Sequence, residues 1–380
     1  MNKIRIAHLF GDCDNGGASG VMDYDNGIWQ HVLNVPRVPL EKKLSDQQIA
    51  KWCRNNGIDV LFCTMWGTFV AGTQKPARGV VSLKEEYPQL KVIGLADEPL
   101  MVDWCSRYGG PSEQMKISQG YIDGLSDFDA IATICDHEVS FYESFNERVY
   151  NLGLPFPDKA YENLIRKDAR KEKGDDLWVG LGVGGNAFTR YERNYLVALA
   201  PVEKAKTKLT AAGRSDIADR IKGILLSWTE KSDMNVIQAI KDRYPWAMFQ
   251  MRTKMEDYLH FLQSCDCVVS PIVRDTPGRL VGECAYFKVP IFGSDVPDLQ
   301  KKLFPDFTAS PWDVNFFANC VSNFFINGRE TYQKVIDSGH DALIYRYGAE
   351  KMKNRFRDML IDLEIGDSWH EVDQEEEVYL

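Results

Sequence analysis

The stretch 264–295 reads SCDCVVSPIVRDTPGRLVGECAYFKVPIFGSD, and it constrains the fold more than any other part of the chain. Its pattern predicts an apolar strand at 267–269, a polar loop, a short helix that begins near Arg279, and a second apolar strand at 289–292. A strand, a helix and a second strand form a βαβ unit, which predicts a parallel sheet. Ligands of such sheets bind at the carboxyl ends of the strands, so we expect a ligand at the loop before Arg279.

The loop and the start of the helix carry residues whose chemistry fits a sugar nucleotide. The spacing of Asp275 and Glu283 lets both carboxylates face one side, where they can accept hydrogen bonds from vicinal hydroxyls. Gly278 permits a close approach of the backbone, and the helix N-terminus offers amide N–H groups to a phosphate. Arg274 and Arg279 add positive charge for the same phosphate. Together these groups predict a site for a nucleoside diphosphate sugar.

The same stretch resembles the donor site of GT-B glycosyltransferases, in particular their retaining group. The signature of that group is an acid, seven residues and a second acid, followed by a helix of small residues and a strand that contains Val-Pro. Here the acids are Asp275 and Glu283, and a Cys-Ala pair and Val289-Pro290 follow them. The resemblance implies that Glu283 holds the ribose and that Asp275, where the family usually has Glu, contacts the transferred sugar.

The resemblance also implies a fold and a reaction. We expect an α/β protein of the GT-B class, with two Rossmann-like domains facing across a cleft. The reaction would move a hexosyl or pentosyl group from a nucleoside diphosphate sugar to an acceptor hydroxyl with retention. It would need no essential metal and no cofactor besides that donor. Amides at the helix start and the arginines Arg274, Arg279 or Arg190 would stabilise the charge of the leaving group.

The length of 380 residues exceeds the usual size of one domain and favours two. The sequence has no apolar stretch of about 18 residues and no signal-like start, so we expect a cytoplasmic protein. The expected layout is an acceptor domain at 1–155, a charged linker at 156–176, a donor domain at 177–345, a helix at 346–364 that in many GT-B chains returns to the first domain, and an acidic tail at 365–380.

The net charge of −10 disfavours a broad nucleic-acid-binding face, because neutralising phosphates requires clustered Lys and Arg. Part of this charge lies in the C-terminal tail GDSWHEVDQEEEVYL, which has no Lys or Arg. The acceptor stays open at this point. A glycan, a small molecule, a protein and the hydroxymethylated bases of phage DNA are all compatible with the fold.

Cysteines and acidic tripeptides do not predict a metal. The nine cysteines are scattered, mostly in apolar segments, and form no C-x-x-C pair, which favours reduced thiols. Three D-x-D tripeptides, at 12–14, 23–25 and 127–129, have the spacing by which GT-A glycosyltransferases hold a divalent cation. Three copies in an acidic chain are expected by chance, so we assign no metal ligand.

A glycine-rich turn follows the first predicted strand, at 4–10. It reads GDCDNGGASG and contains Gly16 and Gly17. In GT-B enzymes a Gly-Gly pair in this loop lies beside the donor phosphate, which would be the role of Gly16 and Gly17. A tight turn with acidic neighbours explains the same residues.

An acidic pair follows the predicted strand at 91–95, in the sequence Ala96-Asp97-Glu98-Pro99. In several GT-B enzymes, including the phage DNA α-glucosyltransferases that this layout resembles, an acid at this place faces the acceptor hydroxyl. Asp97 is therefore the candidate to orient or deprotonate the acceptor. A cap for the following helix is the alternative role.

A match to G-x-G-x-x-G opens the second domain, at Gly180, Gly182 and Gly185. A dinucleotide fingerprint needs a longer strand before its first glycine and a helix directly after its third, and this segment has neither. The same loop suits a GT-B donor domain, where a basic residue points at the diphosphate. Arg190 or Arg193 would supply it here.

Apolar periodicity predicts the remaining elements. Further strands are expected at 59–64, 130–134, 149–155, 177–183, 224–228 and 247–251. Helices are expected at 46–56, 117–125, 136–145, 255–263, 311–327, 329–337 and 349–363.

The sequence thus predicts a glycosyltransferase with an unidentified acceptor. Several alternatives remain. A nucleotide-sugar epimerase of the same fold would convert its donor without an acceptor. An enzyme that glycosylates hydroxymethylated bases of phage DNA shares the layout, an NAD-linked oxidoreductase would use the loop that begins at Gly180, and a non-catalytic carbohydrate-binding protein would turn over nothing.

Overall fold

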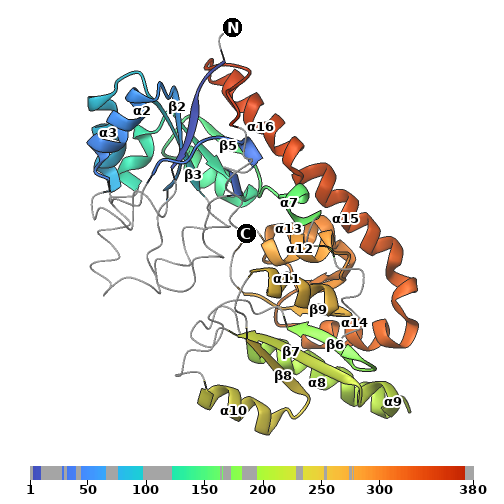
Figure 1. Cartoon of the computed structure of the whole chain (residues 1–380). Coiled ribbons are helices and arrows are strands. Elements are labelled where there is room, and N and C mark those ends of the chain that lie inside the picture. Colours follow the sequence, from blue (N-terminus) through green and yellow to red (C-terminus); the bar gives the residue numbers. More distant parts are fainter. Residues whose placement is uncertain are drawn as a thin grey trace. The chain divides into compact units, whose positions relative to one another are not determined.

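The computed structural model describes residues 3–9, 28–29, 32–39, 44–65, 76–96, 122–162, 165, 173–181, 195–227, 234–251, 255–273, 276 and 278–372. The chain divides into two compact units. One is formed by Met1–Pro157 and Tyr347–Leu380, and the other by Asp158–Arg346. Each unit is built on one parallel sheet with helices packed on it (Figure 1).

The first unit contains a sheet whose described strands follow the order β1-β2-β3-β4-β5, all parallel. The strands are β1 (Ile6–Leu9), β2 (Val60–Thr64), β3 (Lys91–Ala96), β4 (Ala130–Thr133) and β5 (Val149–Asn151). The helices are α2 (Asp46–Asn55), α3 (Pro76–Glu86), α6 (Val139–Glu143) and α16 (Ala349–Asp362), with 3-10 turns η2 (Leu125–Asp127) and η3 (Asp136–Glu138).

Local signals explain where α2 begins and which face it buries. The Ser45 side chain accepts a hydrogen bond from the Gln48 amide, and the Gln48 side chain accepts one from the Ser45 amide. This capping box satisfies two amides at the helix start. Ile49, Ala50 and Cys53 then recur at helical spacing and are buried, so one face of α2 packs on the sheet.

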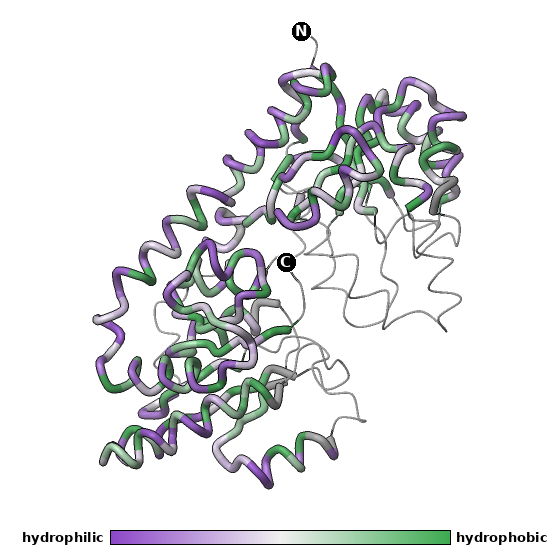
Figure 2. Tube along the Cα trace, turned by 180° about the vertical axis from the view of Figure 1, so that it is seen from behind, coloured by the Kyte–Doolittle hydropathy of each residue, from purple (hydrophilic) through white to green (hydrophobic). Residues whose placement is uncertain are grey.

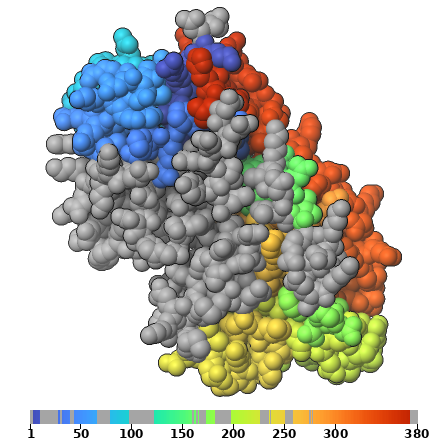
Figure 3. Space-filling model, viewed as in Figure 1, coloured from blue at the N-terminus to red at the C-terminus, as the bar shows by residue number. Residues whose placement is uncertain are grey.

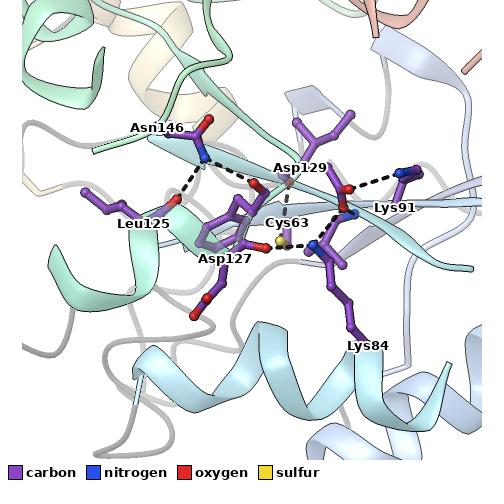
Figure 4. Close-up of polar contacts among 10 residues, drawn as sticks. Cys63, Lys84, Lys91, Leu125, Asp127, Asp129 and Asn146 are labelled. Atoms are coloured by element: carbon purple, nitrogen blue, oxygen red, sulfur yellow. Dashed lines mark hydrogen bonds and ion pairs between the residues drawn. The ribbon is translucent and has the colours of Figure 1, made fainter. Parts of the chain in front are cut away.

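Polar side chains fix the turn that leads into β4 (Figure 4). The Asn146 side-chain amide donates to the backbone oxygens of Leu125 (2.9 Å) and Phe128 (3.1 Å). The Asp129 carboxylate accepts from the Val92 amide at 2.8 Å and pairs with Lys84 of α3 at 3.1 Å. These contacts hold the amino end of β4 against β3.

Helix α16 packs on the first unit through aromatic side chains. Phe356 lies among Trp29, Phe62 and Trp369, with ring centroids 5.1–6.2 Å away. Trp369, beyond the helix, pairs with Ile4 in an isolated parallel bridge. The C-terminal segment, red in Figure 3, accordingly lies against the blue N-terminal residues. Hydrophilic and hydrophobic residues alternate along α16 (Figure 2), as an amphipathic helix requires.

The second unit contains a sheet in the order β11-β10-β9-β6-β7-β8, again all parallel. The strands are β6 (Leu177–Leu181), β7 (Ile221–Ser227), β8 (Ala247–Met251), β9 (Cys267–Ser270), β10 (Ile291–Ser294) and β11 (Thr308–Ala309). Counted along the chain from β6, this is the strand order 3-2-1-4-5-6 of a Rossmann sheet. Its order reverses between β6 and β9.

Helices of several lengths complete the second unit. They are α7 (Asp158–Glu162), α8 (Tyr195–Ala211), α9 (Ser215–Ala218), α10 (Met234–Arg243), α11 (Met255–Ser264), α12 (Arg279–Tyr286), α13 (Asp298–Leu303), α14 (Val314–Asn327) and α15 (Gln333–Tyr347), with 3-10 turns η7 (Pro305–Phe307) and η8 (Arg329–Tyr332). Of these, α8 and α14 pack side by side.

The structure confirms most expected strands and corrects the expectation for two segments, 156–176 and 329–337. The βαβ unit predicted at 264–295 is present as β9, α12 and β10, with Ile291 paired to Val268. The charged segment 156–176 contains helix α7, which its composition did not predict. The helix expected at 329–337 begins as the turn η8 and continues as α15 to Tyr347. Most of the helix expected at 117–125 lies outside the described residues.

Candidate functional site

The second sheet has its switch point between β6 and β9. Strands β6 and β9 are neighbours, with Leu181 opposite Val269 near their carboxyl ends. The segment that follows β6 and the loop 271–278 that follows β9 therefore leave the same edge of the sheet, on either side of the reversal in strand order. In open α/β sheets this crevice binds the ligand. It is also where the sequence predicted the donor.

Loop 271–278 is fixed to its surroundings at two described points. The Ser294 hydroxyl, at the end of β10, donates to the Ile272 oxygen. The Asp298 amide, at the start of α13, donates to the Thr276 oxygen at 3.1 Å. The loop is therefore held from the neighbouring strand and from the helix that follows it.

Gly278 ends the loop in a conformation that favours glycine. Its φ is 90° and its ψ is 44°, in the left-handed region. A Cβ atom there would lie 3.1 Å from the Cβ of Pro297 and 3.3 Å from the Cβ of Leu299. Both the backbone angle and the close neighbours therefore require a residue without a side chain. The local structure therefore requires glycine at position 278, apart from the close approach to a phosphate predicted for it.

Helix α12 begins directly after Gly278, with Arg279 as its first residue. The first amides of an α-helix have no acceptor within the helix, and the helix dipole places partial positive charge there. The start of α12 thus presents N–H groups and the partly buried Arg279 side chain at the carboxyl edge of β9. An anion such as a diphosphate is the ligand that this arrangement favours.

Glu283 lies one turn further along α12 and is buried, with 1% of its surface exposed. Its Oε2 accepts a hydrogen bond from the Tyr258 hydroxyl at 2.6 Å. Its Oε1 accepts one from the Tyr161 hydroxyl at 3.3 Å. A buried carboxylate needs such donors, because burying a charge without hydrogen bonds is costly. The structure thus brings Gly278, Arg279 and Glu283 together on one short helix.

The other predicted site residues lie outside the described residues. They are Gly16, Gly17, Asp97, Arg190, Arg193, Arg274 and Asp275. For Asp97 the preceding residue is described, because β3 ends at Ala96 and Ala96 pairs with Thr133 of β4. The strand thus ends one residue beyond the predicted 91–95, and Asp97 is the next residue along the chain.

Gly180, the first glycine of the G-x-G-x-x-G match, lies inside β6 and not in a turn. A Cβ atom there would lie 3.0 Å from the Cys265 sulfur and 3.1 Å from the Cγ2 atom of Val268. The missing side chain makes room for these two neighbours. The first glycine of a dinucleotide fingerprint forms the tight turn after the strand, which Gly180 does not do.

Sequence reasoning missed three residues, two that contact Glu283 and one buried acid of the first unit. Tyr161 and Tyr258, the partners of Glu283, lie on α7 and α11, and neither shows a local motif. Glu138 follows β4 in the first unit and is 6% exposed. A buried acid at the carboxyl edge of a parallel sheet is unusual. Its only sequence signal was its place a few residues after a strand.

The described residues contain no group of three or more His, Cys, Asp or Glu side chains that could hold a metal ion. Within the same residues, no helix has the length and apolar character needed to cross a membrane. The described cysteines are free thiols, and burial raises the pKa of Cys53 and Cys320 to about 12.

Comparison with solved structures identifies the fold. Sucrose-phosphate synthase of Thermosynechococcus elongatus aligns with a TM-score of 0.65 at 12% identity, over 95% of this chain and 99% of that chain. HepE of Anabaena, solved in complex with UDP and glucose, aligns with a TM-score of 0.61 at 10% identity, over 94% of this chain and 100% of that chain. An α,α-trehalose-phosphate synthase (UDP-forming) of Burkholderia vietnamiensis aligns with a TM-score of 0.58 at 12% identity, over 95% of this chain and 99% of that chain.

These similarities show that the chain has the α/β fold of the GT-B glycosyltransferases, as the sequence predicted. The alignments extend over nearly the whole of each chain, so both units take part in the likeness. Neither a scan of protein-family models nor a search of curated proteins finds a match.

Proposed function

We propose that the protein is a glycosyltransferase that moves a sugar from a nucleoside diphosphate sugar to an acceptor hydroxyl. The observation that carries this proposal is the position of α12 at the switch point of the second sheet. There, Gly278, Arg279 and Glu283 combine amides, a cation and a buried carboxylate in two helical turns. A diphosphate and a ribose require these groups.

We assign the donor to the second unit and the acceptor to the first. Solved proteins with this fold support a UDP-sugar, since one HepE structure contains UDP and glucose and another contains UDP-glucose. We therefore propose UDP-glucose as the first donor to test, and a hexosyl group as the one transferred.

Individual roles follow from the resemblance to the donor motif. Glu283 accepts hydrogen bonds from the ribose hydroxyls, and Asp275 contacts the transferred sugar. The α12 amides at Gly278 bind the diphosphate together with the arginines and the glycine pair of the first unit, which are Arg190, Arg274, Arg279, Gly16 and Gly17.

The reaction breaks the bond between the anomeric carbon and the diphosphate oxygen and forms one to the acceptor oxygen, with retention. The nucleoside diphosphate leaves with the electron pair, and the helix start with Arg279 stabilises the charge that develops on it. Asp97 orients the acceptor hydroxyl and takes its proton. The proposed reaction needs no essential metal, because the amides and arginines neutralise the leaving group.

A ligand screen and a turnover assay test the proposal together. The thermal midpoint of the protein would be measured with UDP, GDP, ADP, UDP-glucose, GDP-mannose and NAD. A ligand at 100 times its dissociation constant stabilises the folded state by about 2.7 kcal/mol. We expect a shift with one nucleoside diphosphate and its sugar, and none with NAD. A shift with NAD alone would contradict the proposal.

The turnover assay would follow release of the nucleoside diphosphate with a set of acceptors and the fate of the sugar nucleotide without them. We expect acceptor-dependent release, and release that persists in EDTA. Conversion of the donor to an epimer without any acceptor would show the epimerase activity instead. Binding without turnover of any kind would point to a carbohydrate-binding protein.

A further inference from the structure

Both oxygens of the Glu283 carboxylate accept a hydrogen bond from a tyrosine. Tyr258 of α11 donates to Oε2 at 2.6 Å, and Tyr161 of α7 donates to Oε1 at 3.3 Å. The two tyrosines are themselves buried, with 8% and 1% of their surface exposed. Two separate elements of the unit therefore hold one acid of the predicted donor site.

Packing fixes the Tyr161 ring against α12. The ring stacks on Phe287, with centroids 5.7 Å apart and planes at 12°, and meets the edge of Tyr286 at 5.6 Å. The Tyr286 hydroxyl in turn donates to the Asp158 oxygen at 2.7 Å, at the start of α7. Helix α7 is thus attached to the α12 segment both at Asp158 and at Tyr161. The Tyr161 hydroxyl cannot leave Glu283 without disturbing these contacts.

A carboxylate accepts hydrogen bonds on both of its oxygens. The two tyrosines fix the orientation of both oxygens of Glu283. The cis hydroxyls of a ribose are a matching pair of donors. Fixing the carboxylate in advance lowers the ordering cost of binding that pair.

We propose that Tyr258 and Tyr161 are positioning residues that hold the Glu283 carboxylate for the ribose 2′- and 3′-hydroxyls of the donor. This inference rests on the function proposed above. It adds that recognition of the ribose is set from α7 and α11 and not by α12 alone. Because its hydrogen bond to Glu283 is the shorter one, Tyr258 contributes more than Tyr161 to holding the carboxylate.

The test compares UDP with 2′,3′-dideoxy-UDP, which lacks both hydroxyls. Dissociation constants would be measured by calorimetry for the wild type, Tyr258→Phe and Tyr161→Phe. Tyr286→Phe is the matched control, because it removes a tyrosine hydroxyl from the same α7–α12 contact and leaves the Glu283 carboxylate untouched. Thermal midpoints would be recorded for each variant.

We expect the wild type to prefer UDP over the dideoxy analogue by about tenfold or more, as hydrogen bonds to a charged group allow. Tyr258→Phe should reduce this preference to about threefold or less, and Tyr161→Phe should reduce it by a smaller factor. Affinity for the dideoxy analogue should stay the same. Tyr286→Phe should keep the wild-type preference even if its thermal midpoint falls.

Two outcomes would overturn the inference. If the tyrosine variants weaken UDP and the analogue equally, or leave the preference unchanged, the tyrosines only support the fold. If the wild type binds UDP without preferring it to the analogue, Glu283 does not hold the ribose. A wild type that binds none of UDP, GDP and ADP would contradict the proposed function itself. Should Tyr258→Phe not fold, Tyr161→Phe carries the same comparison.

Discussion

Phe356 of α16 packs edge-on against Phe62 of β2, with ring centroids 5.1 Å apart and ring planes at 72°. Both side chains are fully buried. One comes from β2 and the other from α16, the last helix among the described residues. This contact explains why the C-terminal segment belongs to the first unit and not to the unit that precedes it in the sequence.

Phe356→Ala should therefore destabilise the first unit. Removing a buried phenylalanine costs about 3–5 kcal/mol of unfolding free energy, because it loses apolar burial and leaves a cavity. Urea unfolding followed by tryptophan fluorescence would report it, since Trp29 and Trp369 belong to the same cluster. Ile361→Ala, on the same helix at 50% exposure, is the control and should change stability by less than about 0.5 kcal/mol. Equal losses in both variants would show that the Phe356 contact does not hold the helix.

Asp129 gives the first unit a pH-dependent contribution to its stability. Burial by itself raises the pKa of Asp129, but the Val92 amide, Lys84 and Lys91 together outweigh it and lower the pKa below its ordinary value of 3.8 (Figure 4). The ionised form is therefore favoured in the folded state. Its contribution is fully present above the unfolded pKa and is lost as the pH falls through the folded pKa.

Asp129→Asn should lower the unfolding free energy at pH 7 by about 1–2 kcal/mol. As the pH falls below about 4, the unfolding free energy of this variant should decrease less steeply than that of the wild type. Chemical unfolding at a series of pH values would show both effects. Asp216→Asn, which removes the exposed partner of Arg214, serves as the control and should have little effect at any pH. A variant that loses stability equally at pH 7 and pH 3 would contradict the pKa argument.

Gly278→Ala should disturb the start of α12 more than its backbone angle alone explains. The left-handed conformation costs a residue with a Cβ about 1–2 kcal/mol. Here the new Cβ would also meet Pro297 at 3.1 Å. Gly213, after α8, has a similar φ of 76° with nothing within 4 Å of a new Cβ, and the Arg214 and Gly213 amides donate to the Leu209 and Thr210 oxygens as in a left-handed helix cap. Gly213→Ala therefore isolates the angular cost. We expect the larger loss of thermal stability, and weaker UDP binding, only for Gly278→Ala. Equal losses would mean that the space around Gly278 is not limiting.

The sequence predicted the sheet strands well where apolar runs alternate with helical patterns. The unit β9–α12–β10 is the clearest case, because its apolar strands, polar loop and glycine lie within one short stretch. The continuation of α15 was missed because Gly339 interrupts the helical pattern. That glycine makes room for Phe304, whose ring a Cβ would meet at 2.5 Å. Glycine is thus required at position 339 by a tertiary contact with Phe304, which a sequence pattern does not reveal.

The candidate site was predictable only in part. Gly278, Arg279 and Glu283 fall within one motif, so their spacing could be read from the chain. The partners of Glu283 could not, since Tyr161 and Tyr258 reach it from helices α7 and α11. Tyr161 also lies in a charged segment that reads as a linker. Long-range hydrogen bonds of this kind leave no periodic signal in a single sequence.

The most direct test of the central claim is hydrogen–deuterium exchange of the wild-type protein with and without UDP. The account predicts that UDP slows exchange in the peptide that contains the start of α12, from Gly278 to Glu283, because the diphosphate accepts from its amides. Peptides from α10, away from the switch point, should exchange at the same rate in both conditions. Binding of UDP with unchanged exchange at α12 would contradict the claim.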